Sequence, residues 1–246
     1  MTDAHYSHPR LVALYDTLNA WDDSRAFYLS LPRRKPESVL DAGCGTGMLA
    51  TAFAAEGHRV VGLDPAEAML AFARRREGAE RVDWRCATLQ AFDAAQRFDL
   101  IYMTGHAFQC LLLDEEVLAA LRNVARLLAP GGRFVFDTRN PAARAWERWQ
   151  PDASRRSGRA PDGEPYEVFD SLLDVDGSFV TFETTYRIGA EAPPLLSRST
   201  LRFHELPEIA EGARRAELRL GRVWGGWDRS ELSDDSPEII ACLQPA

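Results

Sequence analysis

A short apolar segment followed by a glycine-rich loop most constrains how this chain can fold. Residues 39–47 read V-L-D-A-G-C-G-T-G, and Val39 and Leu40 form an apolar pair typical of a buried strand. Glycine then recurs at every second position. Without a Cβ, the backbone can turn tightly and a ligand can lie against it. A helix expected over 48–56 begins at this loop, so its free N–H groups face any ligand bound there.

The spacing of the glycines separates two classes of nucleotide-binding loop. The dinucleotide fingerprint is G-x-G-x-x-G/A. Counted from Gly43, its third small residue would fall at Met48, whereas the third glycine here is Gly47. With Asp41 before the loop, the pattern resembles motif I of the class I methyltransferases that use S-adenosyl-L-methionine. The resemblance implies that the loop contacts the methionine and ribose part of this cofactor. The cofactor-binding candidates are Asp41, Gly43, Cys44, Gly45 and Gly47.

A second strand, expected over 59–63, ends in another acidic residue. Asp64 comes 21 residues after Gly43. A carboxylate at about this distance, at the end of the second strand, can accept both ribose hydroxyls. Alternatively, Asp64 caps the helix expected over 65–76, in which Pro65 would be the first residue. The two roles are compatible, and we expect Asp64 and Pro65 to lie at the cofactor.

Adenine recognition is where the chain departs from the methyltransferase pattern. Related enzymes usually carry Gly-Asp after the third strand, and the Asp receives the adenine amino group. Here the strand expected over 81–85 is followed by C-A-T, without a carboxylate. Backbone groups at Ala87 or the Thr88 hydroxyl can replace it. Met69, on the apolar side of the preceding helix, can cover one face of adenine, although methionine at such spacing is more often plain core.

Composition argues against several classes of partner. The formal charge is −8 and the pI is about 5.2, and no run of basic residues suggests a phosphate-backbone track, so we expect no nucleic-acid substrate. The N-terminus lacks a secretory pattern, and no segment approaches the ~18 apolar residues of a membrane span. Four scattered cysteines indicate reduced thiols and no zinc site. We therefore expect a cytoplasmic protein, monomeric or homodimeric, without a metal or a membrane partner.

Helical and strand patterns alternate along the first 140 residues, which indicates a parallel sheet with helices on both faces. An N-terminal helical segment over 9–30 precedes the sheet, and Pro130-Gly131-Gly132 is expected to end the clearest helix, over 115–128. Two further strands are expected over 98–103 and 133–137. In such sheets, ligands bind beyond the carboxyl ends of the strands.

After residue 140 the pattern changes to β hairpins. A polar loop is expected over 151–165, and three β-like runs follow. The first two are joined by Asp176-Gly177, a hairpin signal. The runs cover 166–174, 178–188 and 197–204. A helix over 205–216 and strands over 218–224 and 238–243 complete the sheet. The expected units are a helical cap (1–34), a cofactor-binding core (35–140), a loop and antiparallel acceptor lid (141–204), and a C-terminal helix with the last two core strands (205–246).

Several stretches are similar to a subfamily of bacterial small-molecule methyltransferases. They include M-T-G-H-A-F-Q at 103–109, F-D-T-R-N-P at 136–141 and S-R-S-T-L-R-F-H at 197–204. The resemblance implies an α/β, Rossmann-like methyltransferase fold with a mostly parallel seven-stranded sheet and an antiparallel β insertion after the fifth strand. It also implies methyl transfer from S-adenosylmethionine to a small-molecule nitrogen or oxygen by in-line displacement. The alternatives are a non-catalytic S-adenosylmethionine-binding sensor or partner subunit, and an NAD-dependent oxidoreductase, which Met48 disfavours.

The acceptor site is expected just beyond the fourth and fifth strands, beneath the insertion. His106 can act as a general base or position the acceptor; alternatively it is a loop imidazole bonded to backbone. Arg139 and Asn140 can bind a polar or acidic acceptor, or form an Asn-Pro turn with a surface arginine. Three further candidates complete the set: Trp224 at the acceptor, and Tyr15 and Met103 at the cofactor.

Overall fold

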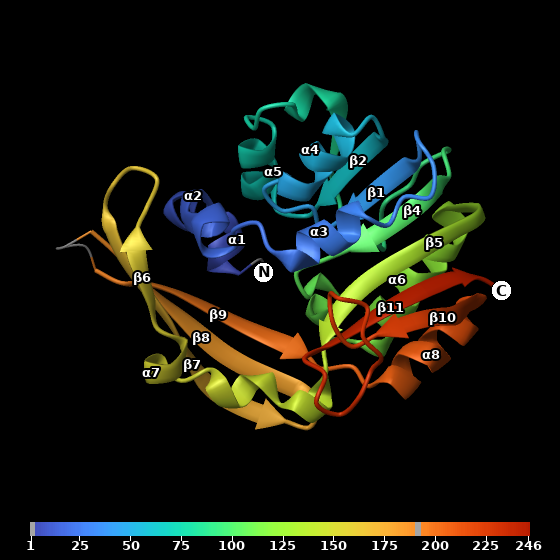
Figure 1. The fold of residues 1–246 in the computed structure, drawn as a ribbon. Coiled ribbons are helices and arrows are strands. Elements are labelled where there is room, and N and C mark those ends of the chain that lie inside the picture. Colours follow the sequence, from blue (N-terminus) through green and yellow to red (C-terminus); the bar gives the residue numbers. More distant parts are fainter. Residues whose placement is uncertain (1–2, 190–192) are drawn as a thin grey trace.

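A seven-stranded sheet forms the centre of the molecule (Figure 1). The computed structural model describes residues 3–189 and 193–246. The strand order is β10-β11-β5-β4-β1-β2-β3, and only β11 runs against the others. The strands are β1 (Ser38–Ala42), β2 (Arg59–Asp64), β3 (Val82–Cys86), β4 (Phe98–Met103), β5 (Leu128–Arg139), β10 (Leu218–Trp224) and β11 (Glu238–Pro245). The predicted α/β class, with a mostly parallel sheet, is confirmed.

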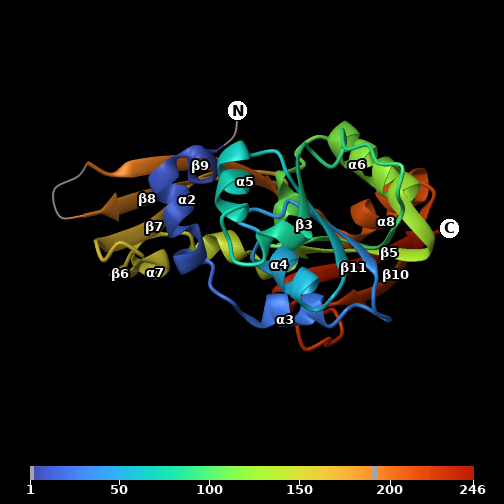
Figure 2. The same cartoon turned by 90° about the horizontal axis from the view of Figure 1, so that it is seen from above.

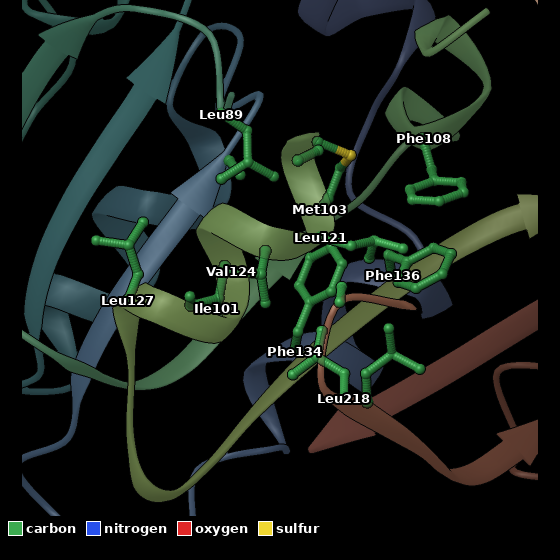
Figure 3. Packing of buried hydrophobic residues seen from close by; sticks show 14 of the residues in the cluster. Leu89, Ile101, Met103, Phe108, Leu121, Val124, Leu127, Phe134, Phe136 and Leu218 are labelled. Atoms are coloured by element: carbon green, nitrogen blue, oxygen red, sulfur yellow. The ribbon is translucent and has the colours of Figure 1, made fainter. Parts of the chain in front are cut away.

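Helices cover both faces of this sheet, as Figure 2 shows for α4 on one side and α6 on the other. They are α4 (Met48–Ala55), α5 (Glu67–Ala73), α6 (Asp114–Leu127) and α8 (Leu206–Arg215), with four 3-10 turns at Ala79–Arg81, Ala107–Cys110, Pro141–Ala143 and Ala145–Arg148. Leu121 and Val124 of α6 pack on Phe134 of β5 in the larger core (Figure 3). We expected Pro130-Gly131-Gly132 to end this helix. These residues instead lie inside β5, because α6 ends at Leu127 and β5 begins at Leu128.

The N-terminal segment predicted to be helical over 9–30 is helical, but a break divides it, and a short helix precedes it. The three helices are α1 (Ala4–Ser7), α2 (Pro9–Leu18) and α3 (Asp23–Leu29). Asp22 caps α3 by accepting the Arg25 backbone N–H. The Arg25 guanidinium donates to the carbonyls of Asn19 and Ala20, which ends the helical ladder there. The break lets α2 pack against α5 while α3 packs against α4.

The insertion is a separate antiparallel sheet in the order β6-β7-β8-β9. Its strands are β6 (Arg156–Arg159), β7 (Pro165–Asp176), β8 (Phe179–Ile188) and β9 (Leu195–Arg202). The hairpin at Asp176-Gly177 is confirmed by the pairing of Asp176 with Phe179. The predicted loop over 151–165 was wrong in part, because it contains α7 (Pro151–Ser154) and β6. All four β6 residues are exposed, so no apolar alternation marks this strand.

Trp84 fills the space directly behind the glycine loop. Its indole N–H donates to the Ala79 carbonyl at 2.9 Å, and a Cβ at Gly47 would lie 2.4 Å from the Trp84 ring. Gly47 also has a φ of +77°. Side-chain packing and backbone geometry thus both require glycine at this position.

We expect Gly47→Ala to lower the free energy of unfolding by roughly 2–4 kcal/mol, from overpacking and left-handed backbone strain together. Gly78→Ala is the matched control, because Gly78 has a φ of +79° but open space around its Cβ position. It should lose only about 1 kcal/mol. Urea denaturation of both variants measures the difference, and equal losses would contradict the role given to Trp84.

Candidate functional site

A cavity of about 490 Å³ lies where the glycine loop, the N-terminal helices and the insertion meet. This size lies within the range of small-molecule sites. The glycine loop and the turn after β4 form one wall. Asp170, Phe182 and Tyr186 of the insertion also line the cavity, as does Tyr15 of α2. The insertion therefore covers the carboxyl ends of the core strands, where the sequence placed the site.

The glycine loop presents bare backbone to this cavity. The N–H groups of Gly43 and Cys44 both donate to the Leu63 carbonyl, at 2.7 and 2.9 Å, which fixes the loop to β2. A Cβ at Gly45 would meet no atom within 4 Å, so open space lies directly beside the chain. Such a cradle accepts a ligand that lies flat on the backbone.

Asp64 fixes the loop and does not line the cavity. One carboxylate oxygen accepts the Gly45 N–H at 2.8 Å, and the other accepts the Ala66 N–H at 2.8 Å. Burial raises its pKa, although these two bonds favour the charged form. Helix α5 begins at Glu67, so Pro65 is exposed outside it, and the predicted helix start at residue 65 was wrong.

Asp41, in β1, lines the cavity and has one carboxylate oxygen without a hydrogen-bond partner among the described residues. The residue is 1 % exposed, and this oxygen is Oδ1. Burial raises its pKa to about 7, with an opposing effect from Tyr102 and a further rise from Asp64. A buried, partnerless acceptor facing a cavity favours a cationic or hydrogen-bond-donating ligand.

The structure brings together only part of the predicted cofactor set. Five members line the cavity: Tyr15, Asp41, Gly43, Cys44 and Gly45. Met69 is fully buried and packs with Val12 and Ala66, while Met103 belongs to the large core. Ala87 is half-buried against that core, and Thr88 is exposed. These four, with Gly47, Asp64 and Pro65, lie outside the cavity wall.

His106 stands in the cavity beside two carboxylates. It has a φ of +62°, and its backbone N–H donates to Asp137 Oδ2 at 2.8 Å. Its Nε2 lies 3.0 and 3.1 Å from the two carboxylate oxygens of Glu238. Asp137 also accepts the Tyr28 hydroxyl at 2.7 Å. Ligand atoms of His106, Asp137 and Glu238 lie within 4.8 Å of one another, a spacing that a metal ion can also accept.

The electrostatics of this cluster keep His106 neutral. Burial and then the Arg139 charge lower its pKa to about 4. Burial raises the pKa of Glu238 to about 7, against the effect of Arg139. The pair can therefore hold or release one proton near neutral pH. Glu238 was missed from the sequence, although an acidic residue opening the last strand, beside the end of β5, was the available signal.

Of the three remaining acceptor candidates, the structure places only Arg139 in the cavity wall. Arg139 lines the cavity, donates to Gln109 Oε1 at 2.8 Å and lies over the Trp149 ring. Asn140 is buried outside the wall, where its amide donates to the carbonyls of Ser233 and Ser236. Trp224 also lies outside the wall and packs edge-on against Phe27. Trp227, three residues later, reaches the cavity instead.

The N-terminal helices connect the two sides of the cavity. Asp16 of α2 accepts the Thr46 hydroxyl at 2.5 Å and pairs with Arg76, which ties the helix to the glycine loop. On the other side, the His5 backbone N–H donates to the Ser197 hydroxyl at 3.1 Å, and Asp3 accepts the Ser199 hydroxyl at 2.6 Å. We call this segment, residues 3–18, the bridge.

Comparison with known proteins supports one enzyme class. A family profile described as a methyltransferase domain matches residues 39–132. The cypemycin N-terminal methyltransferase of a Streptomyces species is 40 % identical over 222 residues, covering 84 % of this chain and 82 % of that protein. A ubiquinone biosynthesis O-methyltransferase of Bradyrhizobium sp. (strain ORS 278) is 36 % identical over 104 residues, 42 % of this chain and only 40 % of its own length.

A solved structure agrees in fold. The S-adenosylmethionine-bound CalS10, an amino pentose methyltransferase from Micromonospora echinaspora, superposes with a TM-score of 0.70 at 21 % identity, covering 93 % of this chain and 96 % of that one. The chain belongs to the S-adenosylmethionine-dependent methyltransferases. It is an enzyme of that class, and its cofactor is S-adenosylmethionine. The comparisons give no support to a non-catalytic sensor or partner subunit.

The raised pKa of Asp41 predicts how the stability of the cofactor-free protein depends on pH. Its folded pKa of about 7 exceeds the ~3.9 of an unfolded aspartate, so the folded state binds more protons between these values. Stability should fall as pH rises through this window. Asparagine at position 41 does not titrate, so the Asp41→Asn variant avoids this loss. Its free energy of unfolding relative to that of the native chain should therefore rise by about 1–2 kcal/mol between pH 6 and pH 8.5. Urea denaturation of both proteins at pH 6 and pH 8.5 measures their free energies of unfolding. A difference between the two proteins that is the same at both pH values would contradict the prediction.

Proposed function

We propose that this enzyme transfers the methyl group of S-adenosylmethionine to an amine nitrogen of a small molecule. The main support for this proposal is that a single cavity contains both the exposed backbone of the glycine loop and the His106–Glu238 pair. Six carboxylates and three arginines line it. The acidic residues are Asp3, Asp22, Asp41, Asp137, Asp170 and Glu238. An excess of negative charge favours cationic ligands, which include both an ammonium acceptor and a sulfonium cofactor.

The relatives support nitrogen over oxygen. The relative that matches along most of its length is named for methylation of an N-terminus. The ubiquinone O-methyltransferase matches over 104 residues, a length that the cofactor-binding core alone can supply. Methylation of an oxygen is the second candidate.

The residues that line the cavity near the glycine loop fit a nucleoside with a charged amino-acid tail. Bare backbone at Gly45 allows close approach, and Oδ1 of Asp41 offers an acceptor for an ammonium group. Tyr15 lines the opposite side from α2. Asp64 acts through the loop, whose position it fixes with the Gly45 bond. When bound, the cofactor supplies an electrophilic methyl group on a positively charged sulfur.

The protein residues prepare the acceptor nitrogen for in-line attack. An amine that enters as ammonium must lose a proton before its lone pair can react. Neutral His106 can pass this proton to the Glu238 carboxylate that its Nε2 contacts. Glu238, whose pKa is raised to about 7, can hold the proton, whereas His106, whose pKa is lowered to about 4, cannot. The insertion and the bridge line the cavity beside the glycine loop, where their residues can limit the access of water and orient an acceptor toward the place where the methyl group would lie.

We further propose that the acceptor is a dissolved metabolite of the cytoplasm, met without nucleic acid or membrane, and that the enzyme is a monomer or homodimer. The acidic balance of −8 disfavours polyanions, and the four cysteines are all free thiols. No helix in the described ranges is long and apolar enough to cross a bilayer.

The acceptor class can be tested by following S-adenosylhomocysteine formation with a panel of amino sugars, peptides with free N-termini, and catechols. We expect turnover with one or more amines and none with the catechols. Turnover confined to catechols would overturn the nitrogen assignment while leaving the enzyme class intact. N-acetylated versions of active amines are the matched controls and should be inactive.

Proton transfer predicts a specific pH profile. Since Glu238 must be ionised, and its pKa is raised to about 7, kcat/KM for an amine acceptor should rise with pH through about 7. Glu238→Gln should lose this ionisation and lower kcat by ~10–100-fold. His106→Ala should lower kcat by ~10²–10⁴-fold with cofactor affinity nearly unchanged.

Glu231→Gln, an exposed change in the loop before β11, is the control. The same measurements in a chelator separate the proton role from a metal bound by His106, Asp137 and Glu238. A Glu238→Gln enzyme that keeps the native pH profile would contradict the proton-sharing role.

A further inference from the structure

A second cavity, of about 500 Å³, lies on the sheet face opposite α8. Along β11, Ile239, Ala241 and Leu243 pack in the core that contains α8. Cys242 and Gln244, which alternate with them, line the second cavity. This cavity shares no lining residue with the methyl-transfer cavity.

Five arginines and no carboxylate line this second cavity, in a chain whose formal charge is −8. They come from four places: the segment before β1, strand β5, strand β10 and the loop after β10. They are Arg33, Arg133, Arg219, Arg222 and Arg229. The local charge is therefore opposite to that of the whole molecule and of the first cavity.

A β-bulge places one of these arginines on the cavity face. In β10, Leu220 pairs with Leu243, but the next pair is Val223 with Ala241, so β10 carries one extra residue. Without the bulge, strict alternation would send Arg222 to the α8 side with Leu220. With it, Gly221 and Arg222 both line the cavity.

Most of this charge is not matched within the protein. Arg133 is buried and pairs with Glu37 at 3.2 Å. Arg229 donates to the Ser30 hydroxyl at 2.7 Å and lies over the Phe27 ring. Within residues 3–189 and 193–246, no carboxylate oxygen lies within 4.0 Å of the guanidinium nitrogens of Arg33, Arg219 or Arg222.

Four of the arginines act on one residue of the cavity wall. Burial raises the pKa of the Cys242 thiol, but Arg133, Arg33, Arg222 and Arg219 all act on it in the opposite direction. Trp224 adds an aromatic wall.

We propose that this arginine-lined cavity binds the phosphate group of a small anionic metabolite. Guanidinium groups from several directions match the tetrahedral oxygens of a phosphate. Edge-strand arginines also discourage aggregation. That role alone would not require the bulge, nor the arginines that other elements bring to the same cavity.

The test is calorimetric titration of the full chain with inorganic phosphate, pyrophosphate and AMP, at constant ionic strength set with NaCl. Each titration is run without and with saturating S-adenosylhomocysteine, which occupies the first cavity. We expect saturable binding of at least one probe. Equal affinity for phosphate and AMP would identify free phosphate as sufficient, whereas tighter AMP binding would indicate that Trp224 contacts the rest of the ligand.

The double variant Arg219→Gln/Arg222→Gln should weaken this binding at least tenfold. The matched control is Arg214→Gln/Arg215→Gln, which removes the same charge from exposed positions of α8, on the opposite face. Circular dichroism establishes that both variants fold. Equal affinities in both variants would overturn the proposal, as would binding no stronger than that of chloride or binding abolished by S-adenosylhomocysteine.

Discussion

The attachment of the glycine loop to β2 is the constraint on which the site depends. Three backbone N–H groups of the loop are fixed by the end of that strand, two on the Leu63 carbonyl and one on Asp64. With these donors engaged, the loop can present open backbone at Gly45 without collapsing on itself. Trp84 supports it from behind and forces glycine at position 47. The cradle is thus formed in advance, so little of the binding free energy is lost in ordering it.

Charge divides the molecule into two opposed sites on a common sheet. The cavity beneath the insertion carries an excess of carboxylates, and the cavity beside β10 carries only arginines. Aromatic packing links them, because Trp224 of the second cavity contacts Phe27, and Phe27 contacts Trp227 of the first. Strand β11 lines both cavities, because it supplies Glu238 to one and Cys242 to the other.

The sequence was sufficient where local patterns determine structure. The loop at 39–47, the alternation of strands and helices and the hairpin at Asp176-Gly177 are all set by neighbouring residues. It was insufficient where distant segments meet. The contact between His106 and Glu238 depends on the register of β11 against β5. Strand β6 consists of exposed residues and is defined by its pairing with β7. The choice between Trp224 and Trp227 depends on a loop conformation. The break between α2 and α3 was not predicted, because apolar residues continue across it, whereas the structure ends α2 at Leu18 and begins α3 at the Asp22 N-cap.

The bridge has an energetic consequence for the order of events. Its helix α2 is tied to the glycine loop, and α1 is tied to the insertion. A molecule that settles against either wall restricts the same short segment. If the cofactor and the acceptor each order this segment, its conformational entropy is lost only once, and the two molecules would then bind with positive cooperativity.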